Sequence, residues 1–186
     1  MNLKTLLFVL LGLLNVHGVI AQDEINYMHR SLVKTLRKGG GSSRSSVKEI
    51  ILADSILKSN QVRGKYFIIN DKNVKQYKYI YVGRVNSCRA GGCSLSGKAG
   101  LGAPEYFDYY ILFDKNKKVQ AVKVFNYQAT HGHEIAAKGW LKQFVGHDGS
   151  ESLRVDKNID AISGATISVY AITRDIELKT KLLGNF

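Results

Sequence analysis

The chain has 186 residues, of which 45% are hydrophobic, and its formal net charge is +12. This length argues against several domains and is sufficient for one domain with a single buried core. The basic residues are scattered, which argues against nucleic acid as a partner. The positive charge either serves solubility alone or favours binding to anionic membrane surfaces or acidic proteins.

The first 21 residues have the pattern of a secretory signal peptide. Lys4 gives a positively charged start, an apolar run extends from Leu6 to Leu14, and small or apolar residues at 19–21 suit a cleavage site. The run is shorter than the roughly 20 residues that a spanning helix needs, and an uncleaved N-terminal anchor is the alternative. We therefore expect an exported protein of the periplasm or cell envelope that begins near Gln22.

Residues 22–45 are predicted to form a basic N-terminal arm outside the core. Apolar residues at Leu32, Val33 and Leu36 allow a short helix, and a Gly/Ser-rich stretch follows at 39–45. Such a composition is flexible in water. The arm is a candidate for peripheral contact with a membrane surface or with a protein partner.

The ordered domain is expected to span residues 46–186 and to begin with a helix. Ser46 followed by Glu49 fits a capping box, in which each side chain satisfies a free backbone N–H at a helix start. The apolar residues that follow recur at helical spacing. They predict a helix that continues to about Lys58.

Two pairs of strands are predicted after this helix. The first pair comprises residues 65–69 and 77–85, which are rich in aromatic and β-branched residues and are separated by a polar turn. The second pair comprises residues 106–113 and 119–127, joined by a short lysine-rich turn. The second pair is the strongest hairpin signal in the chain.

Two helices are predicted after the hairpins, at 135–145, where Gly146 ends the helix, and at 165–183. Trp140 and Phe144 are expected to lie in the core. The apolar positions of the last helix follow helical spacing and are Val169, Ile172, Ile176 and Leu183. The order of elements predicts an α+β fold, with a twisted antiparallel sheet built from hairpins and helices packed against it.

A glycine-rich loop over residues 86–102 contains both cysteines of the chain, Cys88 and Cys93. In an oxidising compartment such a pair is read first as a disulfide. The cysteines are also candidates to join His131 and His133 as a Cys₂His₂ metal set, although their spacing is wider than usual. A redox-active pair is a third alternative, because nearby arginines would stabilise a thiolate.

The segment 160–168 carries the most chemical information, because it enters the last predicted helix. Its small residues allow a ligand to approach the backbone closely, and they are Ser163, Gly164 and Ala165. The first-turn N–H groups of a helix attract anions, and Thr166 adds a hydroxyl beside them. Asp160 is suited to cap a backbone group or to hold the loop. A phosphate could be held there or joined to the hydroxyl, although such a loop alone is more often an ordinary helix cap.

Residues 160–166 resemble the flavinylation motif of the FMN-binding domain family. This family includes the covalent-flavin subunits of the sodium-pumping NADH:quinone reductase and of the Rnf complex. The fixed positions of the motif are all matched here, by Asp160, Ser163, Gly164, Ala165 and Thr166. The resemblance implies that FMN is joined through its phosphate to Thr166 by a phosphoester bond. It also implies a partner, a flavin transferase that uses FAD and magnesium.

The resemblance extends over roughly residues 106–183. Family members carry a turn, often Glu-Thr-Pro-Gly, after the hairpin; Thr130 and Gly132 match it here, whereas Ala129 replaces Glu and His131 replaces Pro. The resemblance implies that Thr130, His131 and Gly132 line the cofactor site. We expect one wall of that site to differ in detail. Residues 86–97 resemble a segment of small secreted members of the family from the Bacteroidetes group.

The two histidines of the predicted turn, His131 and His133, have two interpretations. If they lie near the motif, either can contact the flavin ring or the phosphate and supply a proton or a positive charge. Otherwise they are surface residues of a turn.

Together, the residues and the resemblance predict an exported electron-transfer protein that carries covalent FMN. Its redox partners would be membrane or exported proteins, and its cofactor would perform the redox chemistry. No nicotinamide site is recognisable in the sequence, so a carrier is favoured over a complete oxidoreductase. The alternatives are a flavin-free ligand-binding module of the same fold, a Cys/His metal-binding protein and a reductase of a small substrate.

Overall fold

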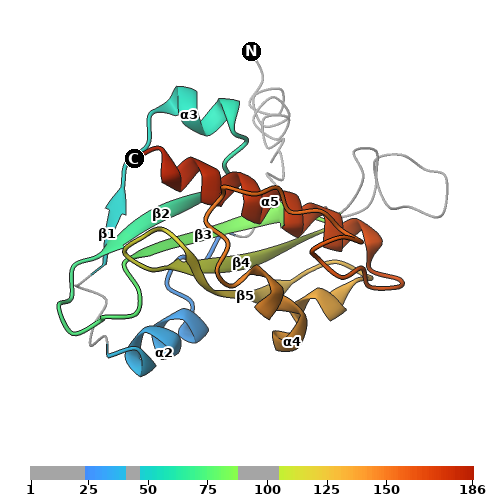
Figure 1. Cartoon of the computed structure of the whole chain (residues 1–186), viewed down its shortest axis with the longest axis horizontal. Helices are drawn as coiled ribbons and strands as arrows, with labels where there is room; N and C mark the ends of the chain where they lie inside the picture. The colour runs from blue at the N-terminus through green and yellow to red at the C-terminus, as the bar shows by residue number, and fades with distance from the viewer. Residues whose placement is uncertain (1–23, 41–46, 88–104) are drawn as a thin grey trace, which may run out of the picture.

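The computed structural model describes residues 24–40, 47–87 and 105–186, and within them a five-stranded antiparallel sheet carries helices on both faces (Figure 1). The strands are β1 (Val47–Ile50), β2 (Gly64–Ile69), β3 (Tyr79–Asn86), β4 (Tyr106–Phe113) and β5 (Val119–Tyr127). The helices are α2 (Arg30–Lys38), α3 (Asp54–Ser59), η2 (His133–Ala136), α4 (Lys138–Leu141), η3 (Lys142–Phe144) and α5 (Thr166–Gly184). This arrangement confirms the predicted α+β class.

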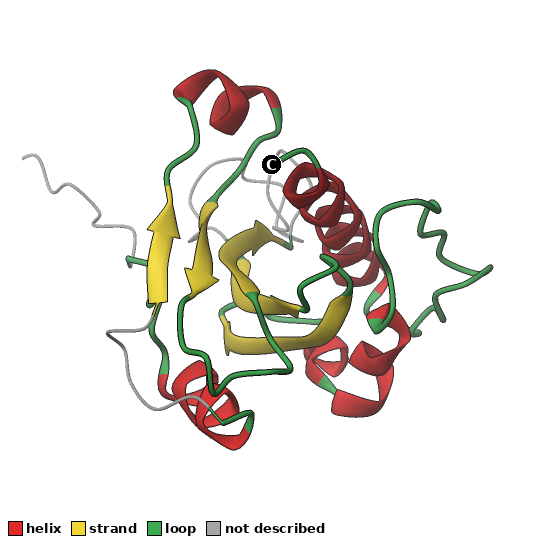
Figure 2. Ribbon diagram, turned by 60° about the vertical axis from the view of Figure 1, so that its left-hand side comes forward, coloured by secondary structure: helices red, strands yellow, loops and turns green. Residues whose placement is uncertain are grey.

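The sheet has the order β1-β2-β3-β4-β5, so each strand pairs with its neighbour in the sequence. Both predicted hairpins are present, and the bounds of β4 and β5 match the prediction. The pairing of β4 with β5 shifts register between Asp108 and Tyr109 and again between Leu112 and Phe113. Such irregularities increase the local twist, and Figure 2 shows the strongly twisted sheet beside α5.

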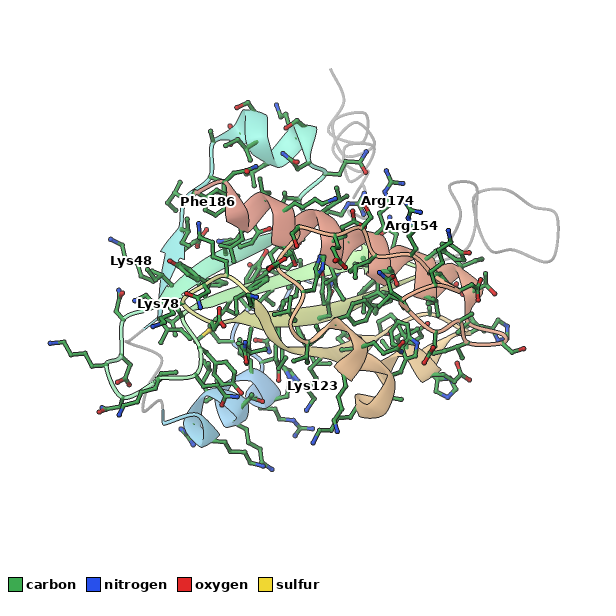
Figure 3. All side chains as sticks on the ribbon, in the orientation of Figure 1. Lys48, Lys78, Lys123, Arg154, Arg174 and Phe186 are labelled. Carbon is green, nitrogen blue, oxygen red and sulfur yellow. The ribbon has the colours of Figure 1, made fainter. Side chains whose placement is uncertain are left out.

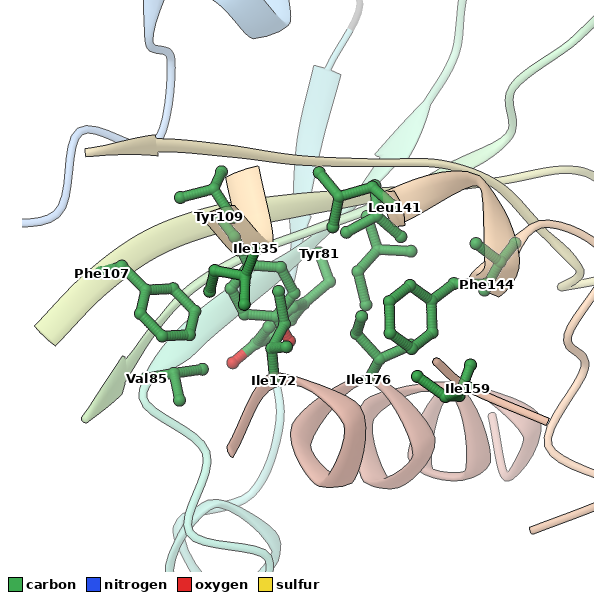
Figure 4. Packing of buried hydrophobic residues seen from close by; sticks show 14 of the residues in the cluster. Tyr81, Val85, Phe107, Tyr109, Ile135, Leu141, Phe144, Ile159, Ile172 and Ile176 are labelled. Carbon is green, nitrogen blue, oxygen red and sulfur yellow. The ribbon is translucent and has the colours of Figure 1, made fainter. Parts of the chain in front are cut away.

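Two hydrophobic clusters lie on opposite faces of the sheet. The larger one joins the sheet to α5 and to the η2–η3 segment, and Figure 4 shows Ile172 and Ile176 of α5 facing sheet residues such as Tyr81. The smaller one joins the other face to α2. Strand β3 serves both clusters, because side chains alternate along a strand: Tyr81 belongs to the first, whereas Ile80 and Val82 belong to the second.

The prediction that residues 22–45 lie outside the core is wrong for α2. Its helical spacing places Leu32 and Leu36 on one face, and both are buried against the sheet. The Thr35 hydroxyl also lies 2.9 Å from the hydroxyl of Tyr110 on β4. Basic composition suggested a free segment, but one apolar stripe is sufficient to pack a helix of this length.

The predicted helix from Ser46 to about Lys58 is also wrong in its first half, although Ser46 itself lies outside the described residues. Residues 47–50 form β1, which pairs with β2, and Glu49 forms an ion pair of 3.0 Å with Lys65. Strand pairing prevails because it satisfies the backbone groups of an edge that would otherwise be open. The second half of the prediction holds as the short helix α3.

The predicted helix at 135–145 is divided into η2, α4 and η3, and a left-handed residue, Gly146, follows it. Its apolar residues still reach the core, because Ile135, Leu141 and Phe144 are buried in the larger cluster (Figure 4). Phe144 is therefore a core residue, as predicted. Trp140 is half-buried and packs edge-on against it, with ring centroids 5.3 Å apart.

A polar network fixes α5 on the sheet. Lys179 is 1% exposed and forms an ion pair of 2.9 Å with Asp175, one turn earlier on the helix. The hydroxyl of Tyr109 donates a hydrogen bond of 2.6 Å to Asp175, and the hydroxyl of Tyr66 donates one of 2.8 Å to the Lys179 carbonyl. Lys179 also donates to the carbonyl of Asn60, after α3. Separating the buried Lys179 charge from its partner would be costly, so the network fixes the position of α5 along the sheet.

Three expectations fall outside the described residues: the signal peptide at 1–21, residues 41–45 of the Gly/Ser-rich stretch, and the part of the loop that holds Cys88 and Cys93. The disulfide and the signal peptide stay predictions. No helix formed by the described residues combines the length and apolarity that a membrane crossing requires.

We predict that Ile172→Ala lowers the free energy of unfolding by about 2–5 kcal/mol, because it leaves a cavity between α5 and the sheet. Urea unfolding followed by circular dichroism measures this loss. The matched control is Leu178→Ala on the same helix, where the side chain is 37% exposed. We expect the control to change stability by about 0.5 kcal/mol or less. Equal losses in the two variants would contradict the packing described here.

Candidate functional site

The loop before α5 is a tight turn that delivers Thr166 to the start of the helix. The N–H of Ala165 donates a hydrogen bond of 3.1 Å to the carbonyl of Ile162, which closes the turn. Gly164 has φ +80, the conformation that favours glycine at the third position of a type II turn. A Cβ added at Gly164 would meet no protein atom within 4 Å, so the space outside this turn is open.

The first turn of α5 offers uncapped backbone donors beside an exposed hydroxyl. The first i→i−4 bond of the helix runs from the N–H of Val169 to the carbonyl of Ala165, and Ala165 supplies no side-chain cap. The three preceding N–H groups, from Thr166 to Ser168, therefore have no helical acceptor. Thr166 is exposed, whereas Ala165 beneath it is buried in the core. This arrangement presents partial positive charge next to the Thr166 hydroxyl.

Asp160, at the start of the motif, is held by its backbone from both sides. The indole N–H of Trp140 donates a hydrogen bond of 2.8 Å to the Asp160 carbonyl. The N–H of Asp160 donates one of 2.7 Å to Oε1 of Gln143. The Asp160 carboxylate is exposed and makes no hydrogen bond to any described residue. The loop is thus positioned by α4 and η3, and the carboxylate is left for a ligand or solvent.

The turn at 130–132 lies against the first turn of α5. Gly132 has φ +87, and a Cβ added there would lie 2.6 Å from Oγ of Ser168. The hydroxyl of Tyr127 donates a hydrogen bond of 2.6 Å to the His131 carbonyl. The same hydroxyl lies 3.0 Å from Oγ of Ser168, which must therefore be the donor of that second bond. The structure thus brings together the two segments that the sequence singled out.

Tyr127 is the connecting residue between the turn and the helix. Its ring stacks on Phe107 at 5.6 Å and 5° between planes. Burial raises its pKa, and this effect exceeds the lowering caused by the hydrogen bond from Ser168. The hydroxyl therefore stays protonated at neutral pH and remains a donor to the His131 carbonyl.

Thr130 is fixed by a residue that precedes β4. Its hydroxyl donates a hydrogen bond of 2.5 Å to Oε1 of Glu105, and its N–H donates a weaker one of 3.2 Å. Sequence reasoning did not identify Glu105, Tyr127 or Ser168 as site residues. Ser168 stands two positions after Thr166 in the motif segment, but nothing in the sequence linked it to a tyrosine forty-one positions earlier.

Both histidines of the turn, His131 and His133, are exposed beside the start of α5. His133 lies 3.8 Å from the Glu134 carboxylate, and its imidazole makes no other ion pair among the described residues. Those residues contain no group of three or more His, Asp or Glu side chains placed to hold a metal. The two cysteines of the Cys₂His₂ alternative lie outside them.

A shallow cavity of about 290 Å³ continues from the Thr166 face of α5. It lies between the helix and residues 153–155 and is lined by Tyr170, one turn after Thr166. Arg154 and Arg174 also line it, and neither forms an ion pair with a described carboxylate. These two cations therefore lie further along α5 than the hydroxyl, with Arg174 two turns after Thr166.

Residues 100–177 match the family model described as the FMN-binding domain. This part of the chain is therefore similar to the FMN-binding domain family. The matched range contains the turn at 130–132, Asp160, Thr166 and most of α5. Comparison with curated proteins and with solved structures gave no match.

The donors at the start of α5 fit the phosphate of FMN. Helix N-termini with free N–H groups are common phosphate sites, and a glycine turn lets a phosphate approach the backbone. Here the turn is open to solvent, the first-turn donors are uncapped, and no carboxylate is bound to them. The flavin-binding character of the family therefore agrees with the chemistry of this helix end.

We predict that Gly132→Ala disturbs the contact between the turn and α5. Alanine is strained at φ +87, and its Cβ would displace the Ser168 hydroxyl. We expect the free energy of unfolding to fall by about 1–3 kcal/mol. Chemical denaturation measures it. Gly139→Ala is the control, because a Cβ there meets no protein atom within 4 Å and alanine favours a helix, so its stability should be unchanged or slightly higher. A harmless Gly132→Ala would contradict the close approach.

Proposed function

We propose that the protein is an exported electron carrier that holds one FMN joined through its phosphate to Oγ of Thr166. One observation supports this most directly: Thr166 places an exposed hydroxyl at the uncapped N-terminus of α5, inside an intact flavinylation motif. Neither feature alone distinguishes a cofactor site from an ordinary helix start. Their coincidence within the segment that matches the FMN-binding domain favours the cofactor site.

The proposed attachment is a phosphoryl substitution carried out with a partner enzyme, a flavin transferase that uses FAD and magnesium. Thr166 Oγ forms a bond to the FMN phosphorus of FAD while the bond from that phosphorus to the bridging oxygen breaks. AMP leaves with the bridging oxygen, and the hydroxyl proton is lost to solvent or to the transferase. Because Thr166 is exposed at a surface turn, another protein can reach it without unfolding the domain.

The residues of the chain have distinct roles in this proposal. The N–H groups at the start of α5 stabilise the single negative charge of the phosphodiester. Trp140 and Gln143 hold the loop in shape through the backbone of Asp160. The turn from Thr130 to Gly132 forms the neighbouring wall, with His131 and His133 at its exposed surface.

A carrier role follows from the openness of the site. When bound, FMN supplies one- and two-electron chemistry. The residues around Thr166 are exposed rather than enclosed, as are Ser163, Gly164, His131 and His133. An exposed site lets partner proteins approach closely for electron transfer. We propose membrane or exported redox proteins as donor and acceptor, and a covalent tether prevents loss of the cofactor outside the cytoplasm.

Intact-mass measurement tests the attachment. The chain is produced with an exported flavin transferase, and we expect an added mass of one FMN minus one water. Thr166→Ala should abolish this addition, because the accepting oxygen is gone, whereas Thr166→Ser should retain it in part. A colour that reversibly bleaches on chemical reduction and returns on oxidation would support the carrier role.

The control for this experiment is Ser168→Ala, which removes the neighbouring hydroxyl of the same helical turn. Its side chain is buried against Tyr127 and is not presented to a transferase. We expect this variant to keep the added mass. An unmodified parent chain, or an addition that persists in Thr166→Ala, would refute the assignment of Thr166.

A further inference from the structure

The face of the sheet opposite α5 carries a basic surface that the flavin site does not use. Its centre is α2, whose apolar side packs on the sheet through Leu32 and Leu36. The remaining surface of this helix is cationic, with no acidic residue in its sequence. Its exposed basic side chains are Arg30, Lys34, Arg37 and Lys38.

Two neighbouring segments extend this surface. A Cβ added at Gly40 would lie 2.6 Å from the Asn73 carbonyl, so the turn that carries Lys72 and Lys75 lies against the end of α2. Lys123 on β5 projects on the same side of the sheet (Figure 3). Lys123 and Arg30 both contribute, after burial, to a lowered pKa of His29, which places them around the start of α2.

We call this surface the basic face and define it by seven residues. They are Arg30, Lys34, Arg37, Lys38, Lys72, Lys75 and Lys123. None of the seven forms an ion pair with a carboxylate of the described residues. The acidic residues nearest in sequence are Glu24 and Asp71, and the Asp71 carboxylate accepts the N–H of Asn73. The positive charge of the face is therefore not neutralised within the described structure.

The basic face lacks the apolar centre that a protein partner would require. Specific protein interfaces depend on a few buried aromatic or aliphatic anchors. The large hydrophobic side chains that are exposed among the described residues lie elsewhere: Ile51, Val145, Ile167, Tyr170, Leu178 and Phe186. The apolar side of α2 is already used in the core, so the helix cannot insert into a bilayer either. The remaining binding mode is electrostatic contact with a broad anionic surface.

We propose that the basic face binds the anionic headgroups of a membrane surface. Clusters of lysine and arginine bind anionic lipid headgroups, and each such residue near the surface adds to the binding. The apolar run Leu6–Leu14, predicted above to belong to a signal peptide, precedes α2 in the sequence, so the proposed export would carry this end of the chain past a membrane surface. Because α2 and α5 pack on opposite faces of the sheet, membrane binding leaves Thr166 and its helix on the side away from the lipid (Figure 1).

Vesicle co-sedimentation of the full chain tests this proposal. The probes are phosphatidylcholine vesicles and phosphatidylcholine vesicles with added phosphatidylglycerol. We expect binding only to the second kind and a steep loss at high salt. Replacing the four cations of α2 by glutamine, in Arg30→Gln, Lys34→Gln, Arg37→Gln and Lys38→Gln together, should weaken that binding about tenfold or more. Glutamine keeps a helix propensity close to that of lysine and arginine.

The matched control removes the same number of charges from exposed residues on the α5 side: Lys58→Gln, Lys138→Gln, Lys142→Gln and Lys157→Gln. This control variant should bind the vesicles as the parent chain does. Equal losses of binding in the two quadruple variants would mean that only the net charge matters, and would overturn the proposal. Equal binding of the parent to both kinds of vesicle would assign the binding to the apolar run and would also overturn the proposal.

Binding to polyglutamate without binding to anionic vesicles would overturn the proposal and indicate an acidic protein partner instead. Urea unfolding of each variant verifies that the fold is retained. The readout does not depend on the flavin, so it is independent of the experiment on Thr166.

Discussion

The packing of α5 on the sheet is the constraint on which the other features depend. Val169, Ile172 and Ile176 are fully buried against the strands, which sets which side of the helix faces inward. The Asp175–Lys179 pair, with Tyr109 and Asn60 around it, then sets the position along the helix axis. Burial and the Asp175 carboxylate raise the pKa of Tyr109, which keeps its hydroxyl a donor to that carboxylate. With both constraints satisfied, the helix begins at the sheet edge where Thr166 is exposed.

Two further segments meet this helix start, and an aromatic side chain makes a hydrogen bond in each. Trp140 donates to the backbone of Asp160, and Tyr127 connects the His131 carbonyl to Ser168. In both cases an aromatic side chain packs with one side in the larger cluster and makes its hydrogen bond at the rim. The shape of the site therefore depends on the hydrophobic core beneath it. A core substitution that shifts β5 or α4 would alter the site without touching a motif residue.

The sequence predicted what local patterns encode. Alternation and turn composition were sufficient for β2 to β5, and helical spacing was sufficient for α5, whose four named apolar positions are all buried. The error at β1 has a local cause: Ile50 and Ile51 fitted a helical stripe, yet Ile50 ends the strand and packs on the core, whereas Ile51 follows the strand and is 81% exposed. The contacts of Tyr127, Glu105 and Trp140 join residues far apart in the sequence, so no single segment carried a signal for them. The motif identified Thr166, and the fold supplied its surroundings.

The basic face around α2 and the start of α5 are far enough apart to act independently. Exposed charges are largely screened beyond about 8 Å at physiological ionic strength. The basic face and the start of α5 are separated by the sheet and by both hydrophobic clusters. The cations of α2 would therefore contribute little to holding a phosphate at Thr166, and in the proposed function that task falls to the local N–H groups. Conversely, the negative charge of a flavin phosphate at Thr166 would not weaken attraction of the opposite face to anionic lipid, so the proposed membrane binding and the proposed cofactor loading would be free to proceed in either order.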